Sequence, residues 1–393
     1  MAKLIDQRND NYIIKKWTRE SEQFTDIYAY LKGRMFDRWI DSVSGSARSN
    51  GHDEGDLIEI PSYIIESLIR DEVLAERDLK VTSTSAVNVA VCDELIGDTD
   101  SYYPYSIFTN VTTGHKTYVN GYVASTNTLA IQDNDASMAA DDNFFLTNIG
   151  GDTKINYQSF DVLGNTTDGT RKDWKFAISI VNPMDVYTAI NQILFESFCI
   201  LFTSHDQYKI VTMDEKGTAD ATWTTPLYDK QNNKYFFNSV LTPISYVYNS
   251  YTLLYHYDYG SGSYRKKLSV DKNGYTSTLT NGATYQATCQ SLFSQYKIIN
   301  KYEYPSNWIY DDTTAEAFMD KVVPWFSKQR LMVSWATPIK NYIQYEIGDQ
   351  VILNNSNLIP TGINNSSKFM ITEKVINPLL GAPFIQFKLL EVT

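Results

Sequence analysis

The chain has few of the residues on which metal and redox sites depend. Its 393 residues include only three cysteines and four histidines. The cysteines lie far apart and form no CxxC pair, so their spacing indicates neither a zinc site nor a disulfide framework. Cys199 lies in the apolar run 198–202, which predicts a buried, unreactive thiol. The histidines form no HExxH or HxxxH pattern, and we predict no metal ligand. These residues are Cys92, Cys199, Cys289, His52, His115, His205 and His256.

Long apolar runs are also absent. No run approaches the roughly 18 apolar residues that a membrane-spanning helix needs. Asp6 and Arg8 interrupt the amino-terminal segment where a signal peptide requires an unbroken apolar core. We therefore expect no stable membrane insertion, and we expect the protein to be made and kept in a cytoplasm or released by lysis.

Positive charge is in deficit. The chain has 34 Lys and Arg against 46 Asp and Glu, a net charge of -12. Tight binding of phosphate backbones is driven by Lys and Arg releasing counterions, so we expect no specific nucleic-acid binding. An acidic surface still suits a conduit through which nucleic acid slides without adhering.

Sequence motifs of catalysis are missing as well. There is no Walker loop, no G-x-S-x-G elbow and no G-x-G-x-x-G before a helix. The glycine-rich piece 260–262 joins two predicted strands and lacks the helix amino terminus that holds a phosphate. We predict that the protein is not an enzyme, with no catalytic residue, no cofactor-binding residue and no cofactor.

Several acidic groups leave an alternative open. A carboxylate hydrolase needs only two suitably spaced acids, and Asp141–Asp142 and Asp311–Asp312 are the most visible pairs. The segment 133–142 lacks the central glycine and closing glutamate of a calcium loop. His205–Asp206 favours a turn over a catalytic dyad, and 52–56 favours a solvated loop over a metal site.

Tyrosine is abundant. Fifteen of the 29 tyrosines lie between Tyr228 and Tyr310, and Thr, Asn and Ser are frequent throughout. Aromatic and β-branched residues favour strands, and Asn, Gly and Ser favour the turns between them. The bulk of the chain should be β, with most tyrosines used in cross-strand packing; a carbohydrate-binding face is the alternative.

Helical periodicity is clear in three places. Within 58–72, Pro61 suits a first turn, apolar residues repeat at helical spacing, and Glu66 is expected on the solvent side. The second helix is expected to begin at Asn182 and Pro183. The third runs over 313–326, with Phe318, Val322 and Trp325 on one side, and Pro324 bends or ends it. The residues Asp311-Asp312-Thr313 are expected to form its start.

The strands are predicted from alternation and from turn residues. A β module over 101–148 is expected to turn at 113–114 and at Asn120–Gly121. The remaining predictions are hairpins over 198–213 and 247–270, a strand at 330–336, and a small antiparallel closing sheet of 345–353, 369–375 and 384–392.

The order of these pieces resembles the baseplate hub or tail-tip hub proteins of tailed bacteriophages. The resemblance runs from about residue 32 to the end and is weaker over 98–152. It rests on Gly33-Arg34, the segment 56–70, the helix and hairpin of 186–213, the strands at 248–257, the helix before 330–333, and the closing strands at 345–353 and 369–375.

The resemblance implies an α+β, predominantly β fold, with tube-like β-barrel domains, a few packed helices and an inserted β module. The expected division is 1–56 as an amino-terminal segment and linker, 57–97 with 153–240 as a first α+β hub domain, 98–152 as the insert, and 241–393 as a β-rich tube-like domain.

The same resemblance implies a structural virion protein in the tail, assembled in the host cytoplasm. It would be a homotrimer that joins the tail tube to the central spike around a channel for tape measure and DNA. Its partners would be tail tube and distal tail proteins, the spike, the tape measure and other baseplate or fibre proteins. The alternatives are a receptor- or carbohydrate-binding tail protein and a hexameric distal tail adaptor.

Overall fold

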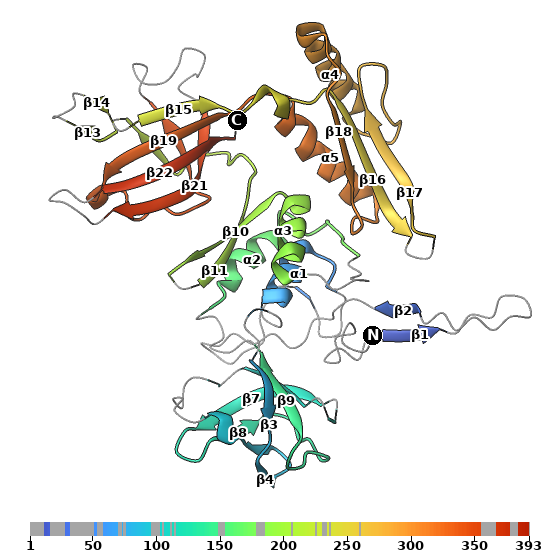
Figure 1. Ribbon diagram of the computed structural model, residues 1–393, viewed down its shortest axis with the longest axis vertical. Coiled ribbons are helices and arrows are strands. Elements are labelled where there is room, and N and C mark those ends of the chain that lie inside the picture. Colours follow the sequence, from blue (N-terminus) through green and yellow to red (C-terminus); the bar gives the residue numbers. More distant parts are fainter. Residues whose placement is uncertain are drawn as a thin grey trace, which may run out of the picture. The chain divides into compact units, whose positions relative to one another are not determined.

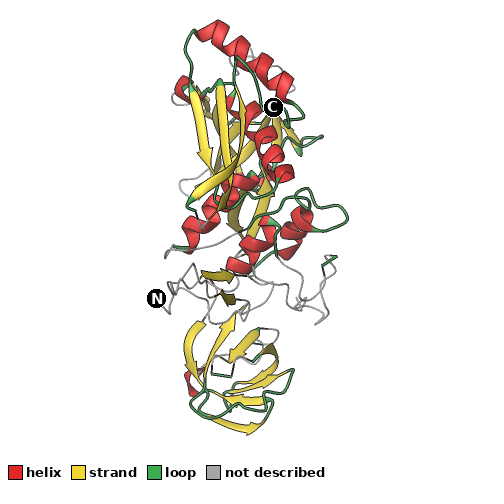
Figure 2. Cartoon of the chain, turned by 90° about the vertical axis from the view of Figure 1, so that its right-hand side faces the viewer, coloured by secondary structure: helices red, strands yellow, loops and turns green. Residues whose placement is uncertain are grey.

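A computed structural model describes most of the chain from residue 51 onward and two short strands before it (Figure 1). The residues outside the description are 1–11, 16–27, 32–50, 53–57, 70–72, 74–75, 96–102, 104–105, 111, 114, 148–153, 178–184, 206, 225, 230–233, 236, 259–260, 355–366, 378–383 and 393. Strands outnumber helices in the described part (Figure 2), which confirms the predicted α+β, predominantly β class.

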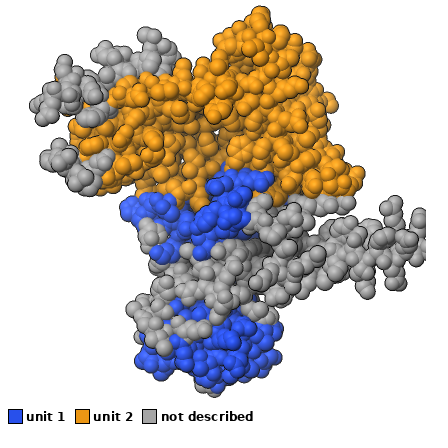
Figure 3. All heavy atoms as spheres, in the orientation of Figure 1, with its two compact units in different colours: residues 1–194, 203–210 blue, residues 195–202, 211–393 orange. Residues whose placement is uncertain are grey.

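The chain divides into two compact units, coloured separately in Figure 3. Unit 1 comprises residues 1–194 and 203–210, and unit 2 comprises 195–202 and 211–393. The expected domain boundary at 240 lies inside unit 2, and the predicted division stays a prediction.

Unit 1 contains a seven-stranded, fully antiparallel sheet. Its strand order is β3-β9-β6-β7-β8-β5-β4. The sheet begins at Glu76, so it extends beyond the insert expected at 98–152. The bounds are β3 Glu76–Lys80, β4 Ser83–Ala86, β5 Val89–Val91, β6 Ile107–Asn110, β7 Lys116–Val123, β8 Thr128–Ile131 and β9 Asn143–Thr147.

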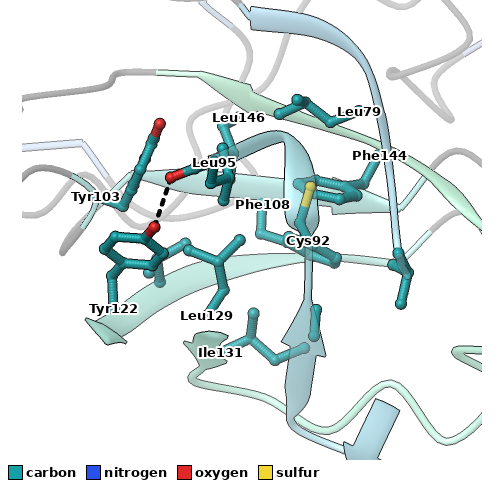
Figure 4. Packing of buried hydrophobic residues seen from close by; sticks show 13 residues of the cluster. Leu79, Cys92, Leu95, Tyr103, Phe108, Tyr122, Leu129, Ile131, Phe144 and Leu146 are labelled. Atoms are coloured by element: carbon teal, nitrogen blue, oxygen red, sulfur yellow. Dashed lines mark hydrogen bonds between the residues drawn. The ribbon is translucent and has the colours of Figure 1, made fainter. Parts of the chain in front are cut away.

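An apolar core holds this sheet together (Figure 4). Phe108 and Phe144 stack with ring centroids 4.9 Å apart. The Tyr122 hydroxyl donates a 2.7 Å hydrogen bond to the carbonyl of Leu95, at the end of the short helix η3 (Asp93–Leu95). The buried phenol thus keeps a polar partner while its ring packs in the core.

The turn predicted at Asn120–Gly121 is wrong. Both residues lie inside β7, where the register shifts between Val119 and Gly121. The first part of β7 pairs with β6 and the second part with β8. An Asn-Gly pair forms a hairpin turn only when its two flanks pair with each other, and here each flank has another partner.

The first predicted helix is confirmed as α1, Pro61–Leu68. The expected solvent face is wrong, because Glu66 is only 4% exposed. Helix α2, Tyr157–Gly164, has no counterpart in the sequence predictions. It packs against α1, and the Tyr63 hydroxyl donates a 2.8 Å hydrogen bond to Asp161. A Cβ at Gly164 would lie 2.5 Å from the Tyr63 ring, so the close approach requires glycine.

The second predicted helix is α3, Val186–Ser197, and a hairpin of β10 (Cys199–Ser204) and β11 (Gln207–Thr212) follows as predicted. Asn182 and Pro183 lie outside the described residues. Asp185 caps the helix, since its carboxylate accepts a 3.0 Å hydrogen bond from the backbone N–H of Thr188. The strands β1 (Tyr12–Lys15) and β2 (Tyr28–Leu31) form a separate antiparallel pair.

One half of unit 2 is a three-stranded sheet with two helices. The order is β17-β16-β18, with β16 antiparallel to β17 and parallel to β18. The predicted hairpin over 247–270 is therefore confirmed. The bounds are β16 Ser250–Asp258, β17 Ser263–Val270, α4 Gly282–Tyr296, β18 Lys301–Pro305 and α5 Asp312–Phe326.

Helix α5 is the third predicted helix, and it continues two residues past Pro324. Three of its carboxylates lie four residues apart and accept hydrogen bonds from neighbouring hydroxyls, with Glu316 accepting from Thr280 at 3.1 Å. Asp312 accepts from Tyr255 at 2.8 Å, and Asp320 accepts from Tyr285 at 2.6 Å. These two tyrosines are buried, so the tyrosine-rich region serves packing here.

The other half of unit 2 is a six-stranded sheet, ordered β12-β20-β21-β22-β19-β15. All its pairs are antiparallel except β12 with β20. The bounds are β12 Ala221–Trp223, β15 Phe237–Leu241, β19 Leu331–Pro338, β20 Gln350–Leu353, β21 Lys368–Asn377 and β22 Phe384–Glu391. Also described are β13 Tyr228–Asp229, β14 Lys234–Tyr235, η5 Ile244–Tyr246 and η6 Ile339–Asn341.

The predicted closing sheet is confirmed in its strands but not in its size. Three further strands, β12, β15 and β19, complete it. Tyr345 and Ile347 precede β20 and pack against the core from outside the strand. Two of the added strands supply large core residues, since Trp223 of β12 and Trp335 of β19 are both fully buried in the core of this sheet.

Arg330 joins the two halves of unit 2. Its guanidinium donates to the carbonyls of Trp325 at 3.1 Å, Glu391 at 3.0 Å and Pro324 at 3.5 Å. It also lies 3.9 Å from the centre of the Trp325 ring. The side chain thus links the carboxyl end of α5 to the end of the last strand.

Candidate functional site

The acidic segment 133–142 forms a hydrogen-bond network. Asp135 and Asp142 are buried, and the side-chain amide of Asn110 donates 2.9 Å hydrogen bonds to both. Asp135 also accepts from Thr113 at 2.7 Å, and Asp142 accepts from the backbone N–H of Ala139 at 2.9 Å. These contacts fix the two loops at one end of the seven-stranded sheet.

The second acidic pair has a structural role at the start of α5. Asp311 caps the helix by accepting a 2.6 Å hydrogen bond from the backbone N–H of Thr314. Asp312 forms a 2.7 Å ion pair with Lys266. The hydrogen bonds from Lys266 and Tyr255 lower the pKa of Asp312, which keeps this carboxyl ionised.

The histidines are not brought together. His205 has a left-handed backbone at the β10–β11 turn and bonds Ser204 at 2.9 Å; Asp206 lies outside the described residues. His256 contacts the carbonyl of Tyr310 at 2.8 Å, and His115 that of Asp133 at 3.3 Å.

The His52 ring lies 5.3 Å from the Tyr63 ring, and the other residues of the acidic segment, 53–56, lie outside the described residues. Cys92, Cys199 and Cys289 are all buried. No group of three or more His, Cys, Asp or Glu in the described residues could hold a metal ion. Within the same residues, no helix has the length and apolar character to cross a membrane.

The most distinctive surface is apolar and lies at one edge of the six-stranded sheet. We call it the β15 surface. Val240 and Leu241 are 51% and 53% exposed, Ile244 and Tyr246 are 54% and 56%, and Ile298 and Ile299 are 68% and 49%. The 298–299 turn belongs to it because Asn300 donates to the carbonyls of Ser245 and Val247 at 3.0 and 2.8 Å. Clustered exposed apolar side chains are typical of surfaces that contact another protein, a membrane or a ligand.

Leu241 shows that the core of the sheet is open at this edge. Its partner across the strand pair is Leu331, a buried core residue. Phe237, on the same face of β15, packs against that core. Leu241 therefore points to the core side, because side chains alternate along a strand. More than half of its surface nonetheless remains uncovered.

Unit 2 has two larger sheets besides the two-stranded β13–β14 pair, and two of their edge strands, β15 and β17, differ in charge. The exposed edge strand β17 carries Arg265, Lys266 and Lys267 in succession. The edge strand β15 carries no charge over Phe237–Leu241. In the described residues, no strand pairs with the outer side of either one. Charged edges oppose the addition of another strand, whereas uncharged edges permit it.

Sequence reasoning did not identify the β15 surface. The segment 237–246 contains no charged residue, and the apolar stretch at its start ends at Pro243. The same pattern is expected of a strand that is buried inside a sheet. Exposure separates the two cases, and exposure depends on which segments cover the strand.

No family model and no curated protein matches the chain. It is similar to a tail protein from Neisseria meningitidis MC58, with a TM-score of 0.38 at 9% identity over 78% of this chain and 96% of that one. It is similar to a 43 kDa tail protein of prophage MuSo2 from Shewanella oneidensis, with a TM-score of 0.35 at 9% identity, covering 80% and 93%. A chain of a native gene transfer agent virion gives a TM-score of 0.37 at 10% identity, and the match spans 68% of this chain and 63% of that one.

Proposed function

We propose that the protein is a structural component of a bacteriophage tail or baseplate, assembled in the host cytoplasm and retained in the virion tail. The observation that carries the proposal is the β15 surface, with a core leucine left more than half exposed. A protein that works as part of an assembly leaves such surface for a neighbouring subunit to cover.

More specifically, we propose a hub that joins the tail tube to the central spike and surrounds the channel for tape measure and DNA. The order of elements from about residue 32 onward supports this, since helix α3 and its hairpin, the tyrosine-rich strands, α5 and the closing strands follow in the order of the resemblance. Its partners would be the tail tube and distal tail proteins, the spike, the tape measure and other baseplate or fibre proteins.

The acidic balance fits a conduit. A channel wall rich in carboxylates repels the phosphates of passing DNA, so that transit proceeds without adhesion. The net charge of -12 supplies the required sign. A channel lined mainly by Lys and Arg in the assembled particle would contradict this part of the proposal.

The role we propose is non-enzymatic. Three of the four carboxylates singled out as alternatives have structural contacts: Asp311 caps a helix, Asp312 forms an ion pair and Asp142 accepts a hydrogen bond from Asn110. Several tyrosines of the 228–310 region are used in packing, as with Tyr251, which is 1% exposed and donates to the carbonyl of Tyr248 at 2.8 Å.

The test is to locate the protein in the intact particle. A small tag at the exposed loop 215–218 can be labelled with gold-conjugated antibody and imaged by electron microscopy. Label at the junction of tube and spike, with three copies per particle, is the expected result. Label on the fibres alone would support the receptor-binding alternative, and six copies would support the distal adaptor.

A further inference from the structure

We propose that Asn273 is a modification site, at which the side-chain amide is converted to a carboxyl group without an enzyme. The attacking group is the backbone nitrogen of Gly274, and Asp271 accepts the proton that this nitrogen loses. The site lies in the turn that follows β17, in unit 2.

An asparagine followed by a glycine is the sequence in which this reaction meets least hindrance, because glycine has no side chain to crowd the attacking nitrogen. The described residues contain three complete pairs of this kind, at 120–121, 273–274 and 281–282. The reaction requires the backbone to rotate until the glycine nitrogen reaches Cγ of the asparagine. The surroundings of each pair therefore decide which one reacts.

Two of the pairs are held in place. The pair 120–121 lies inside β7, where its glycine is paired with β8, so rotation must break the ladder. Gly282 is packed, since a Cβ there would lie 2.1 Å from the Tyr275 ring. The side-chain amide of Asn281 also donates a 3.2 Å hydrogen bond to Asp320. Neither pair can rotate without losing native contacts.

The third pair has open surroundings. Asn273 is exposed, and its side-chain amide has no hydrogen-bond partner among the residues that the structure describes. A Cβ added at Gly274 would meet no atom within 4 Å. The Cγ carbon can therefore turn toward the Gly274 nitrogen without displacing a neighbour.

Asp271 is placed to take the proton of that nitrogen. Its Oδ1 accepts hydrogen bonds from the backbone N–H groups of Asn273 at 2.7 Å and of Gly274 at 3.0 Å. A general base must lie within hydrogen-bond reach of the proton it removes, and this carboxylate does. The contact that shapes the turn thus also directs the N–H of Gly274 at a proton acceptor.

The step balances without an oxidant or a cofactor. The Gly274 nitrogen forms a bond to Cγ of Asn273, and its proton passes through the Asp271 carboxylate to the departing amide group, which leaves as ammonia. Water then opens the resulting five-membered imide at either of its carbonyls. The product at position 273 is aspartate or isoaspartate, and each adds a negative charge.

Conversion alters the turn after β17. The backbone N–H of Asp271 donates a 2.9 Å hydrogen bond to the carbonyl of Gly274, and Val270 forms a bridge to Tyr275. Isoaspartate lengthens the main chain by one carbon between the residues that make these contacts, so both are disturbed. A particle cannot replace its subunits, and converted turns would accumulate as it ages. This last consequence rests on the proposed function, whereas the reaction itself does not.

The experiment follows the purified full chain during incubation at mildly alkaline pH, with peptide mass spectrometry of samples taken at intervals. Asn273 should convert first, roughly tenfold or more faster than Asn120 and Asn281, because only those two must lose native contacts. In urea the three rates should approach one another. No conversion at Asn273, equal rates in the folded protein, or rate differences that persist in urea would each overturn the inference.

Two variants test the mechanism, with circular dichroism to show that each is folded. Gly274→Ala should slow the reaction several-fold by crowding the nitrogen, and alanine fits because Gly274 is not among the described glycines with a left-handed backbone. Asp271→Asn keeps an acceptor oxygen in the turn but removes the base, so conversion should slow by roughly tenfold or more. An unchanged or faster rate in either variant would overturn the mechanism. The labelling of intact particles does not depend on these rates, so the proposed function can stand or fall separately.

Discussion

Replacing Arg330 by methionine should destabilise unit 2 strongly. The side chain is only 5% exposed, and it donates to carbonyls of α5 and of the last strand. Methionine has a similar length and keeps much of the apolar packing against Trp325, but it donates no hydrogen bond.

The magnitude follows from the lost contacts. The carbonyls of Trp325 and Glu391 each lose a good donor, at about 1–3 kcal/mol per buried acceptor, and the 3.5 Å contact to Pro324 adds little. Loss of the cation over the Trp325 ring costs about 1–2 kcal/mol. Burial lowers the pKa of the Arg330 guanidinium to about 10, so removing the charge returns part of this cost. The net expectation is a loss of about 3–4 kcal/mol.

The assay is equilibrium unfolding in urea followed by the fluorescence of the seven tryptophans, one of which, Trp325, lies under the Arg330 guanidinium. The matched control is Arg265→Met. Arg265 is exposed on β17 and bonds Asp258 at 3.0 Å through Nε, so its loss should cost less than about 1 kcal/mol. Equal stability of the two variants would refute the reasoning that the buried guanidinium holds the halves of unit 2 together.

Three other predictions concern single groups. Asn110→Asp removes a shared donor and puts a third carboxylate beside two buried ones, so unit 1 should lose about 2–4 kcal/mol in urea unfolding, whereas Asn120→Asp on the surface should change little. The pKa of Asp312 is lowered in the folded state, first by its hydrogen bond from Lys266, so its contribution is present above the unfolded pKa and is lost as pH falls below about 3.8. Asp312→Asn should make the free energy of unfolding depend less on pH in that range, by less than about 1 kcal/mol. A pH dependence identical to that of the unchanged protein would contradict the assignment. Burial raises the pKa of the Cys289 thiol to about 12, so this thiol should react with a disulfide reagent at pH 8 only after unfolding, and rapid reaction of native protein would contradict its burial.

The elements that sequence patterns predicted share one property, a strong local signal. In α5, Phe318 and Val322 repeat at helical spacing and Asp311 caps the start, and all three behave as expected. In β16, Tyr251 and Leu253 alternate with less buried neighbours, as the period of two requires.

The missed elements have weak local signals. Helix α4 is rich in Thr, Ser and Gln, and its buried stripe consists mainly of Tyr285, Cys289 and Leu292. So few buried residues give only a weak helical pattern in the sequence, and the helix forms because β17 gives it a surface to cover. Helix α2 is short, and its partner α1 lies about a hundred residues earlier.

The contacts of the candidate site also differ in whether they join residues that are near or distant in the sequence. The absence of histidine and cysteine motifs could be read from the sequence, and so could the helix-capping role of Asp311, because these depend on neighbours a few residues away. The link from Asn110 to Asp135 and Asp142 could not, since it crosses two loops of one sheet.

By itself, the sequence determined the class of the protein: mostly strands, a few helices, few histidines and cysteines, and an acidic balance, because periodicity and composition are local properties of the chain. Only the tertiary structure decided that the closing strands belong to a six-stranded sheet and that β15 lies at its open edge. Pairing between distant segments sets which apolar strand is covered and which is left exposed, and Leu241 differs from its buried partner Leu331 for that reason alone.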